Sequence, residues 1–62
     1  MRIGIVSDIN NLKVKDELLS YIKTIGHVGI DLNKHDNVLD NCEELVKAYN
    51  NESVERGLAI DD

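Results

Sequence analysis

The sequence predicts an α/β fold with the element order β-α-β-α-β, which is half of a doubly wound parallel sheet. Two observations predict it. Three short apolar segments suit buried strands, and they alternate with two longer stretches whose apolar residues recur at helical spacing. Because a helix joins each pair of strands, we expect right-handed crossovers, parallel pairing and the strand order 2-1-3. The 62 residues form one partial domain of this Rossmann-like kind, residues 1–62.

The first strand is expected near residues 2–7. Residues 3–6, Ile-Gly-Ile-Val, are apolar or glycine and rich in β-branched side chains, which favours a strand buried on both faces. A polar run, Ser-Asp-Ile-Asn-Asn, follows at residues 7–11. In such sheets ligands bind outside the carboxyl ends of the strands, so Asp8 lies where chemistry is expected.

The first helix is expected near residues 11–25, with Asn10 or Asn11 as its cap and Gly26 at its end. The same two asparagines lie at a helix start, where backbone N–H groups suit a phosphate. Lys15 is predicted on the solvated side. The predicted buried stripe consists of Val14, Leu18, Ile22 and Ile25.

The second helix is expected near residues 38–50, after a polar loop at residues 33–37. Glu43, Glu44 and Lys47 are predicted to face solvent. The predicted apolar residues are Val38, Cys42, Leu45 and Tyr49, with Leu39 and Val46 alongside. Cys42 is therefore interpreted as a buried structural thiol.

The two later strands differ in their surroundings. Alternating apolar residues predict a second strand near residues 27–32, close to a sheet edge. The third, near residues 56–61, contains a buried apolar run at 57–60 and leads into Asp61 and Asp62. A parallel sheet needs cover on both faces, and no helix follows this strand. We therefore expect either the amino-terminal part of something longer or a chain that completes itself by association through this open strand.

Composition excludes several classes of function. Seven basic against twelve acidic side chains give a net charge of -5, which argues against a nucleic-acid surface. No apolar run approaches the ~20 residues needed to cross a membrane. A single cysteine and no signal peptide predict a reducing, cytoplasmic setting. His27 and His35 lack partners at metal-ligand spacing and are expected to be solvated, so no metal site is predicted.

Three segments together resemble a known family. They are Met-Arg-Ile-Gly-Ile-Val-Ser-Asp at residues 1–8, the helix that ends at Gly26, and GHVGIDL at residues 26–32. In this order and spacing they resemble the start of the sugar-phosphate isomerases that include ribose-5-phosphate isomerase B and the galactose-6-phosphate isomerase subunits. CEELVKAYN at 42–50 and RGLAIDD at 56–62 are most similar to the A-type galactose-6-phosphate isomerase subunits. The resemblance spans all 62 residues but only the first part of a family member's usual length.

The resemblance implies an aldose–ketose interconversion without metal or organic cofactor, in which a base removes a proton from the carbon beside the carbonyl to give an enediol(ate). Asp8 matches the family's aspartate that contacts the sugar phosphate substrate. Asp61 stands at the position of the cysteine base, a replacement also found in the A-type subunits. Ile9 replaces a histidine that often follows the aspartate. The family's later acid and phosphate-binding arginines have no counterpart in residues 1–62.

Three functional hypotheses follow. The chain is a subunit or amino-terminal part of the isomerase, a homo- or hetero-oligomer with a related subunit. Alternatively, it is a non-catalytic partner that supplies Asp8 to another subunit's active site. The third is a flavodoxin- or receiver-like binding module, although receivers carry a pair of acidic residues where Asp8 is alone. From the pattern alone, Asp8 and Asp61 also suit plain turn and strand-end positions.

Overall fold

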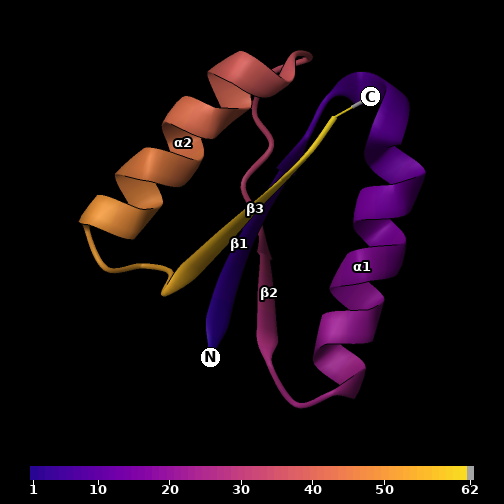
Figure 1. Cartoon of the computed structure of the whole chain (residues 1–62), viewed down its shortest axis with the longest axis vertical. Coiled ribbons are helices and arrows are strands. Elements are labelled where there is room, and N and C mark those ends of the chain that lie inside the picture. The colour runs from indigo at the N-terminus through magenta and orange to yellow at the C-terminus, as the bar shows by residue number, and fades with distance from the viewer. Residues whose placement is uncertain (62) are drawn as a thin grey trace.

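The computed structural model describes residues 1–61 and shows a three-stranded parallel sheet between two helices (Figure 1). The strands are β1 (Arg2–Ser7), β2 (Val28–Asp31) and β3 (Arg56–Ile60), in the order β2-β1-β3. The helices are α1 (Leu12–Thr24) and α2 (Val38–Asn50), and a 3-10 turn, η1 (Ile9–Asn11), precedes α1. The predicted α/β class, element order and strand order are confirmed. Asp62 lies outside the described residues.

The central strand β1 carries most of the core. It pairs in parallel with β2 (Ile3 beside Gly29) and with β3 (Ile3 beside Arg56). Gly4, Ile5 and Val6 are buried as predicted, whereas Ile3 is only half-buried and Ser7, predicted as the first residue of the polar run, is buried as well. The buried apolar side chains are Ile5, Val6, Ile22, Ala48 and Val54. No helix among residues 1–61 is long and apolar enough to cross a membrane.

Two glycines let α2 approach the sheet closely. A Cβ at Gly57 would lie 2.9 Å from Leu45 Cδ1, and one at Gly4 would meet the same atom at 2.9 Å. Leu45 therefore fills the space that side chains on β1 and β3 would occupy. On the other face, Leu19 of α1 comes as close to Gly29 of β2. The helices thus cover different halves of the sheet, α1 over β2 and β1, and α2 over β1 and β3.

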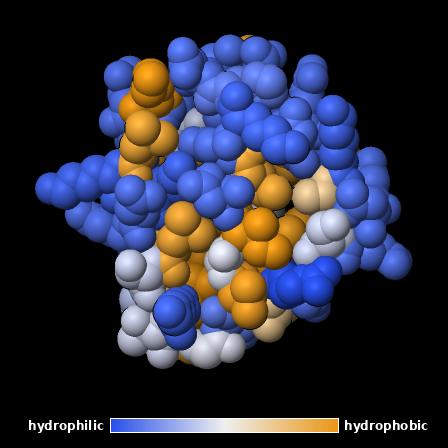
Figure 2. Space-filling model, turned by 180° about the vertical axis from the view of Figure 1, so that it is seen from behind, coloured by the Kyte–Doolittle hydropathy of each residue, from blue (hydrophilic) through white to orange (hydrophobic). Residues whose placement is uncertain are grey.

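Because of this offset, a helix covers only one face of each outer strand, β2 and β3. The prediction of a buried third strand is wrong, since Gly57, Leu58 and Ala59 are all exposed. Parallel strands are buried only where helices cover both faces, and α1 does not extend over β3. Val28 of β2 is also exposed. The side of the molecule that is turned away from the viewer in Figure 1 shows an apolar area surrounded by polar residues (Figure 2).

The buried face of α1 differs from the predicted stripe. Ile22 is buried as predicted, but Val14 is 48% exposed and Lys15 is buried in its place. The Lys15 ammonium reaches the end of β2, where Nζ lies 2.8 Å from Asp31 Oδ2. The aliphatic stem of a lysine can cover apolar surface while its charged end pairs elsewhere. Lys15 therefore belongs to the sheet-facing side, and its predicted solvated position is wrong.

The second helix also turns a different face to the sheet. Its buried residues are Asn41 and Ala48, and Leu45 is partly buried between them. Three apolar residues that were predicted on or beside the core face are exposed instead: Leu39, Val46 and Tyr49. Only one row of α2 can reach the strands, and the row with the smaller and polar residues does so.

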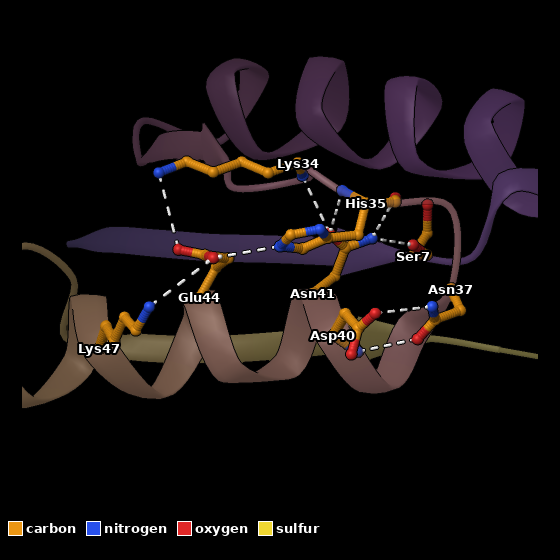
Figure 3. A network of polar contacts seen from close by, with 8 residues as sticks. All are labelled: Ser7, Lys34, His35, Asn37, Asp40, Asn41, Glu44 and Lys47. Atoms are coloured by element: carbon orange, nitrogen blue, oxygen red, sulfur yellow. Dashed lines mark hydrogen bonds and ion pairs between the residues drawn. The ribbon is translucent and has the colours of Figure 1, made fainter.

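Asn41 is fully buried and all of its polar atoms are paired (Figure 3). Its Nδ2 donates to the carbonyl oxygens of Ser7 (2.8 Å) and His35 (2.9 Å). Its Oδ1 accepts from the backbone N–H groups of Lys34 and His35, both at 2.9 Å. One amide therefore ties the loop before α2 to the carboxyl end of β1.

We expect Asn41→Ala to lower the free energy of unfolding by about 2–4 kcal/mol, because it leaves several backbone groups without their partner in a buried place. A domain this small has little stability to lose, so the variant should be partly unfolded at room temperature. Urea unfolding followed by circular dichroism measures the change. Asn50→Ala, at the exposed end of α2, is the matched control. Equal midpoints for the two variants would contradict this account.

Candidate functional site

The carboxyl ends of the three strands lie at one edge of the sheet, which is the upper edge in Figure 1. Asp8 and Asp61 each follow directly on a strand of the β1–β3 pair, in which Ser7 lies beside Ile60. The Asp8 N–H donates to the Ile60 carbonyl at 3.3 Å, so the pairing continues to Asp8. The backbones of Asp8 and Asp61, both predicted as site residues, are therefore neighbours.

A hydrogen bond from Asn11, at the end of the 3-10 turn that follows, orients the Asp8 carboxylate. Asn11 Nδ2 donates to Asp8 Oδ1 at 2.6 Å, across the 3-10 turn η1. The turn is fixed to the rest of the molecule, since the Ile9 N–H donates to the Asp36 carbonyl at 2.9 Å. Asp8 is partly exposed, and among residues 1–61 its second oxygen, Oδ2, has no hydrogen-bond partner. That oxygen can accept a hydrogen bond from a ligand.

The two predicted cap residues do not cap α1 with their side chains. Asn11 is the N-cap residue by position, but its side chain makes no capping bond and turns to Asp8 instead. Asn10 is exposed. Both remain next to Asp8 at the amino end of α1, where the helix dipole favours an anion. The predicted cap position of Asn11 is therefore confirmed, although no side-chain capping bond forms, and Asn10 is not the cap.

Asp61 follows β3 and is exposed. Its backbone neighbour across the sheet is the Asp8 turn, because Ile60 lies beside Ser7 and accepts from Asp8. The structure thus joins Asn11 to Asp8 by a hydrogen bond, and it places Asp61 and Asn10, the other two predicted site residues, in the backbone next to these positions. They come from the β1–α1 connection and the end of β3.

Sequence reasoning missed the polar residues that shape this edge. Asn33, after β2, accepts from the Ser7 N–H with Oδ1 (2.8 Å) and donates to Ser7 Oγ with Nδ2 (3.1 Å). Asp31 Oδ1 accepts from the Asn33 N–H at 3.0 Å while its other oxygen pairs with Lys15. The sequence contains one signal for the Lys15–Asp31 ion pair: Lys15 lies seven residues before Ile22 and therefore on the same face of the helix.

A charged cluster lies beside the edge, over the loop that leads into α2 (Figure 3). The Glu44 carboxylate is its centre, with its side chain only 16% exposed. His35 Nε2 lies 3.2 Å from Oε2, Lys34 Nζ lies 3.6 Å from Oε1, and Lys47 Nζ lies 3.9 Å from Oε2. Glu44 was predicted to face solvent, and its place in this cluster corrects that prediction.

The cluster changes the titration of Glu44. The hydrogen bond from His35 lowers the pKa of the Glu44 carboxyl below its ordinary value of 4.5, and the charges of Lys47 and Lys34 act in the same direction, against partial burial, which raises it. His35 is thus held by a carboxylate and is only partly solvated, at 42% exposure. Among residues 1–61, no group of three or more His, Cys, Asp or Glu side chains is placed to hold a metal ion.

Comparison with known proteins gives no assignment. No protein-family model, no curated protein and no solved structure matches the chain. The site is therefore defined by its own geometry.

The lowered pKa of Glu44 predicts a pH-dependent contribution to stability. A carboxyl whose pKa is lower in the folded than in the unfolded state stabilises the fold above its ordinary pKa of 4.5 and loses that effect as the pH falls through the folded value. Wild type should therefore be more stable than Glu44→Gln at neutral pH, and the difference should shrink below pH 4.5.

Urea unfolding of both proteins over this pH range measures the difference. Glu17→Gln, on the exposed surface of α1, controls for the change in net charge. A Glu44→Gln difference that stays constant from neutral to acidic pH would contradict the contribution of the cluster.

Proposed function

We propose that the chain is a subunit, or the amino-terminal part, of a sugar-phosphate aldose–ketose isomerase of the family it resembles. In this proposal the three-stranded sheet is half of a doubly wound, Rossmann-like sheet, and the protein works in the cytoplasm with a sugar phosphate as its small-molecule partner. The observation that carries the proposal is the register of β1 and β3, which puts Asp8 and Asp61 side by side at the carboxyl edge.

Asp8 is the proposed sugar-binding residue. A carboxylate accepts hydrogen bonds from hydroxyl groups, and such bonds to a charged group are stronger than neutral ones. Because Asn11 already holds Oδ1, the carboxylate is oriented before a sugar arrives, while Oδ2 is left for it. Orientation in advance lowers the entropic cost of binding.

Asn10 and Asn11 are proposed to contact the sugar phosphate from the amino end of α1. Their backbone precedes the first helical turn, where N–H groups lack helical partners and the helix dipole favours negative charge. Lys15, in the first part of α1, is engaged by Asp31. The resemblance assigns the phosphate-binding arginines to later parts of a family member.

Asp61 stands where the family has its cysteine base. A base must reach the proton it removes, and an aspartate at the end of β3, beside the Asp8 turn, is near the sugar in this proposal. The same replacement suits the alternative in which the chain is a non-catalytic partner subunit and supplies Asp8 to a site completed by a related subunit. In either case the functional unit is an oligomer.

We expect ribose-5-phosphate or galactose-6-phosphate to shift the backbone amide NMR signals of Asp8, Asn10, Asn11 and Asp61. Asp8→Asn should weaken binding by about tenfold, the effect of losing one hydrogen bond to a charged group. Asp16→Asn, on the exposed side of α1, is the matched control and should bind like wild type. Shifts that avoid the carboxyl edge, or equal losses in both variants, would contradict the proposed site.

We also expect the 62-residue chain alone to show no appreciable turnover of either sugar phosphate. Residues 1–62 have no counterpart of the family's later acid and phosphate-binding arginines, and loss of one general acid–base group typically costs ~10²–10⁴ in rate. A coupled or polarimetric assay with purified chain measures this. Robust turnover by the chain alone would refute the assignment of missing groups to a partner or to later residues.

A further inference from the structure

Strand β2 directs a row of backbone groups away from the rest of the sheet. The N–H groups of Val28 and Leu32 each donate over 3.0 Å to carbonyl oxygens of residues 1 and 5, so both point to the β1 side. Because backbone groups alternate in direction along a strand, the N–H and C=O groups of Gly29 and Asp31 point outward. Among residues 1–61 no strand lies on that side of β2. Such an edge is a template for pairing with another extended chain.

β2 remains an edge strand when the sheet is extended. The observed order β2-β1-β3 matches the start of the 2-1-3-4-5 order of flavodoxin-like doubly wound sheets, in which further strands are added beyond the third. A continuation of the sheet, as in the proposed function, therefore occupies the β3 side. The outer edge of β2 is left for a separate molecule.

On the α1 face, the surface beside β2 is a hollow with an apolar floor. Its lining residues come from α1 and from the chain at β2: Leu19, Ser20, Lys23, His27, Val28, Gly29 and Asp31. A Cβ at Gly29 would lie 2.8 Å from Leu19 Cδ2, so the leucine side chain covers the glycine. On this face, a residue of an added strand that lies beside Gly29 meets Leu19, which favours an apolar side chain.

On the α2 face, the surface beside β2 is polar and basic. Since α2 covers β1 and β3, a second hollow lies between α2 and the chain that leaves β2. It is lined by Leu32, Lys34, Glu44, Lys47, Ala48, Asn51 and Ser53. The ammonium groups of Lys34 and Lys47 lie 3.6 and 3.9 Å from the Glu44 carboxylate (Figure 3). Two lysines share one carboxylate, so this hollow carries a net positive charge.

The charges beside the β2 edge favour an acidic partner, although the whole chain has a net charge of -5. Asp31 is neutralised by Lys15 at 2.8 Å, and Lys23 has no ion pair among residues 1–61. In and beside the two hollows, four lysines stand against two carboxylates: Lys15, Lys23, Lys34 and Lys47 against Asp31 and Glu44. Lysines beside an edge strand disfavour pairing with apolar or basic strands, and an acidic strand removes that penalty.

We propose that β2 binds an extended acidic segment of a partner protein by strand addition. The segment pairs with the outward backbone groups of Gly29 and Asp31 and becomes a fourth strand of the sheet. Side chains alternate between the two faces of a strand. Every second residue of the segment is therefore apolar and lies over Leu19, and the residues between are acidic and face Lys34 and Lys47. This inference is independent of the proposed enzymatic function.

The probe is the peptide acetyl-Glu-Val-Glu-Val-Glu-Val-Glu-amide, which has this alternation. Added to isotope-labelled chain at low salt, it should shift the amide NMR signals of Gly29 and Asp31 and slow their hydrogen exchange. The amide of Val28 faces the β1 side and should change less. N-methyl groups on the valines alone or on the glutamates alone block opposite edges of the peptide, so one of these two peptides should bind and the other should not.

Charge reversal gives a test that folding effects do not mimic. Lys34→Glu and Lys47→Glu should each weaken binding of the acidic peptide by about tenfold, since each places like charges opposite one another. Each variant should in turn bind acetyl-Lys-Val-Lys-Val-Lys-Val-Lys-amide more tightly than wild type does. Both lysines are largely exposed, so the fold should tolerate the changes, which circular dichroism checks. Lys13→Glu, at an exposed position that lines neither hollow, is the matched control.

Three results would overturn the proposal. One is an acidic peptide that leaves the Gly29 and Asp31 amides unchanged at millimolar concentration, or that binds equally well with either set of N-methyl groups. Another is an equal loss of binding in Lys13→Glu and in the two hollow variants. The third is protection of the Gly29 amide in the chain alone that increases with protein concentration, which would make a second copy the occupant of the edge.

Discussion

The carboxamide of Asn41 is the interaction on which the carboxyl edge depends. The chain leaves β2 and must cross the end of β1 before α2 begins, and this crossing exposes backbone groups that no strand or helix pairs. Asn41 meets four of them with one side chain, two carbonyls and two N–H groups. Buried polar groups that are fully paired define a unique arrangement, whereas a partly paired set would be costly. The position of the crossing loop then fixes the Asp8 turn through the contact between Ile9 and Asp36.

The strands and their order could be predicted from the sequence, but the faces of the helices could not. Strand positions follow from local composition, and parallel order follows from short helical connections. The choice between Val14 and Lys15 for the buried side of α1 depends on a partner in another element. Asp31 lies beside Ile5 in the sheet, and its carboxylate pairs with Lys15. This pairing depends on the register of β1 and β2, which the sequence of α1 does not contain. Hydrophobic periodicity alone favours valine.

The site could be predicted in part for the same reason. That Asp8 and Asp61 are neighbours follows from three parallel strands whose carboxyl ends meet. The turn of Asn11 toward Asp8, and the capture of His35 by Glu44, depend on loop conformations that have no periodic signal. On α2 the predicted apolar face included Leu45, which packs on the sheet, but also Tyr49, which is exposed. The close approach of Leu45 to Gly4 and Gly57 decides which row packs on the sheet.

The strand order also constrains how this chain can fold. β1, the first strand among residues 1–61, lies in the centre, and its partners are residues 28–31 and 56–60. Neither pairing is local, since Ile3 is matched with Gly29 on one side and with Arg56 on the other. Loop closure therefore has to precede most of the stabilising contacts, which slows folding relative to a helical bundle of this size. During synthesis β1 can pair with β2 only after residue 31 has emerged, and the α2 side of the sheet stays uncovered until α2 and β3 follow, up to residue 60.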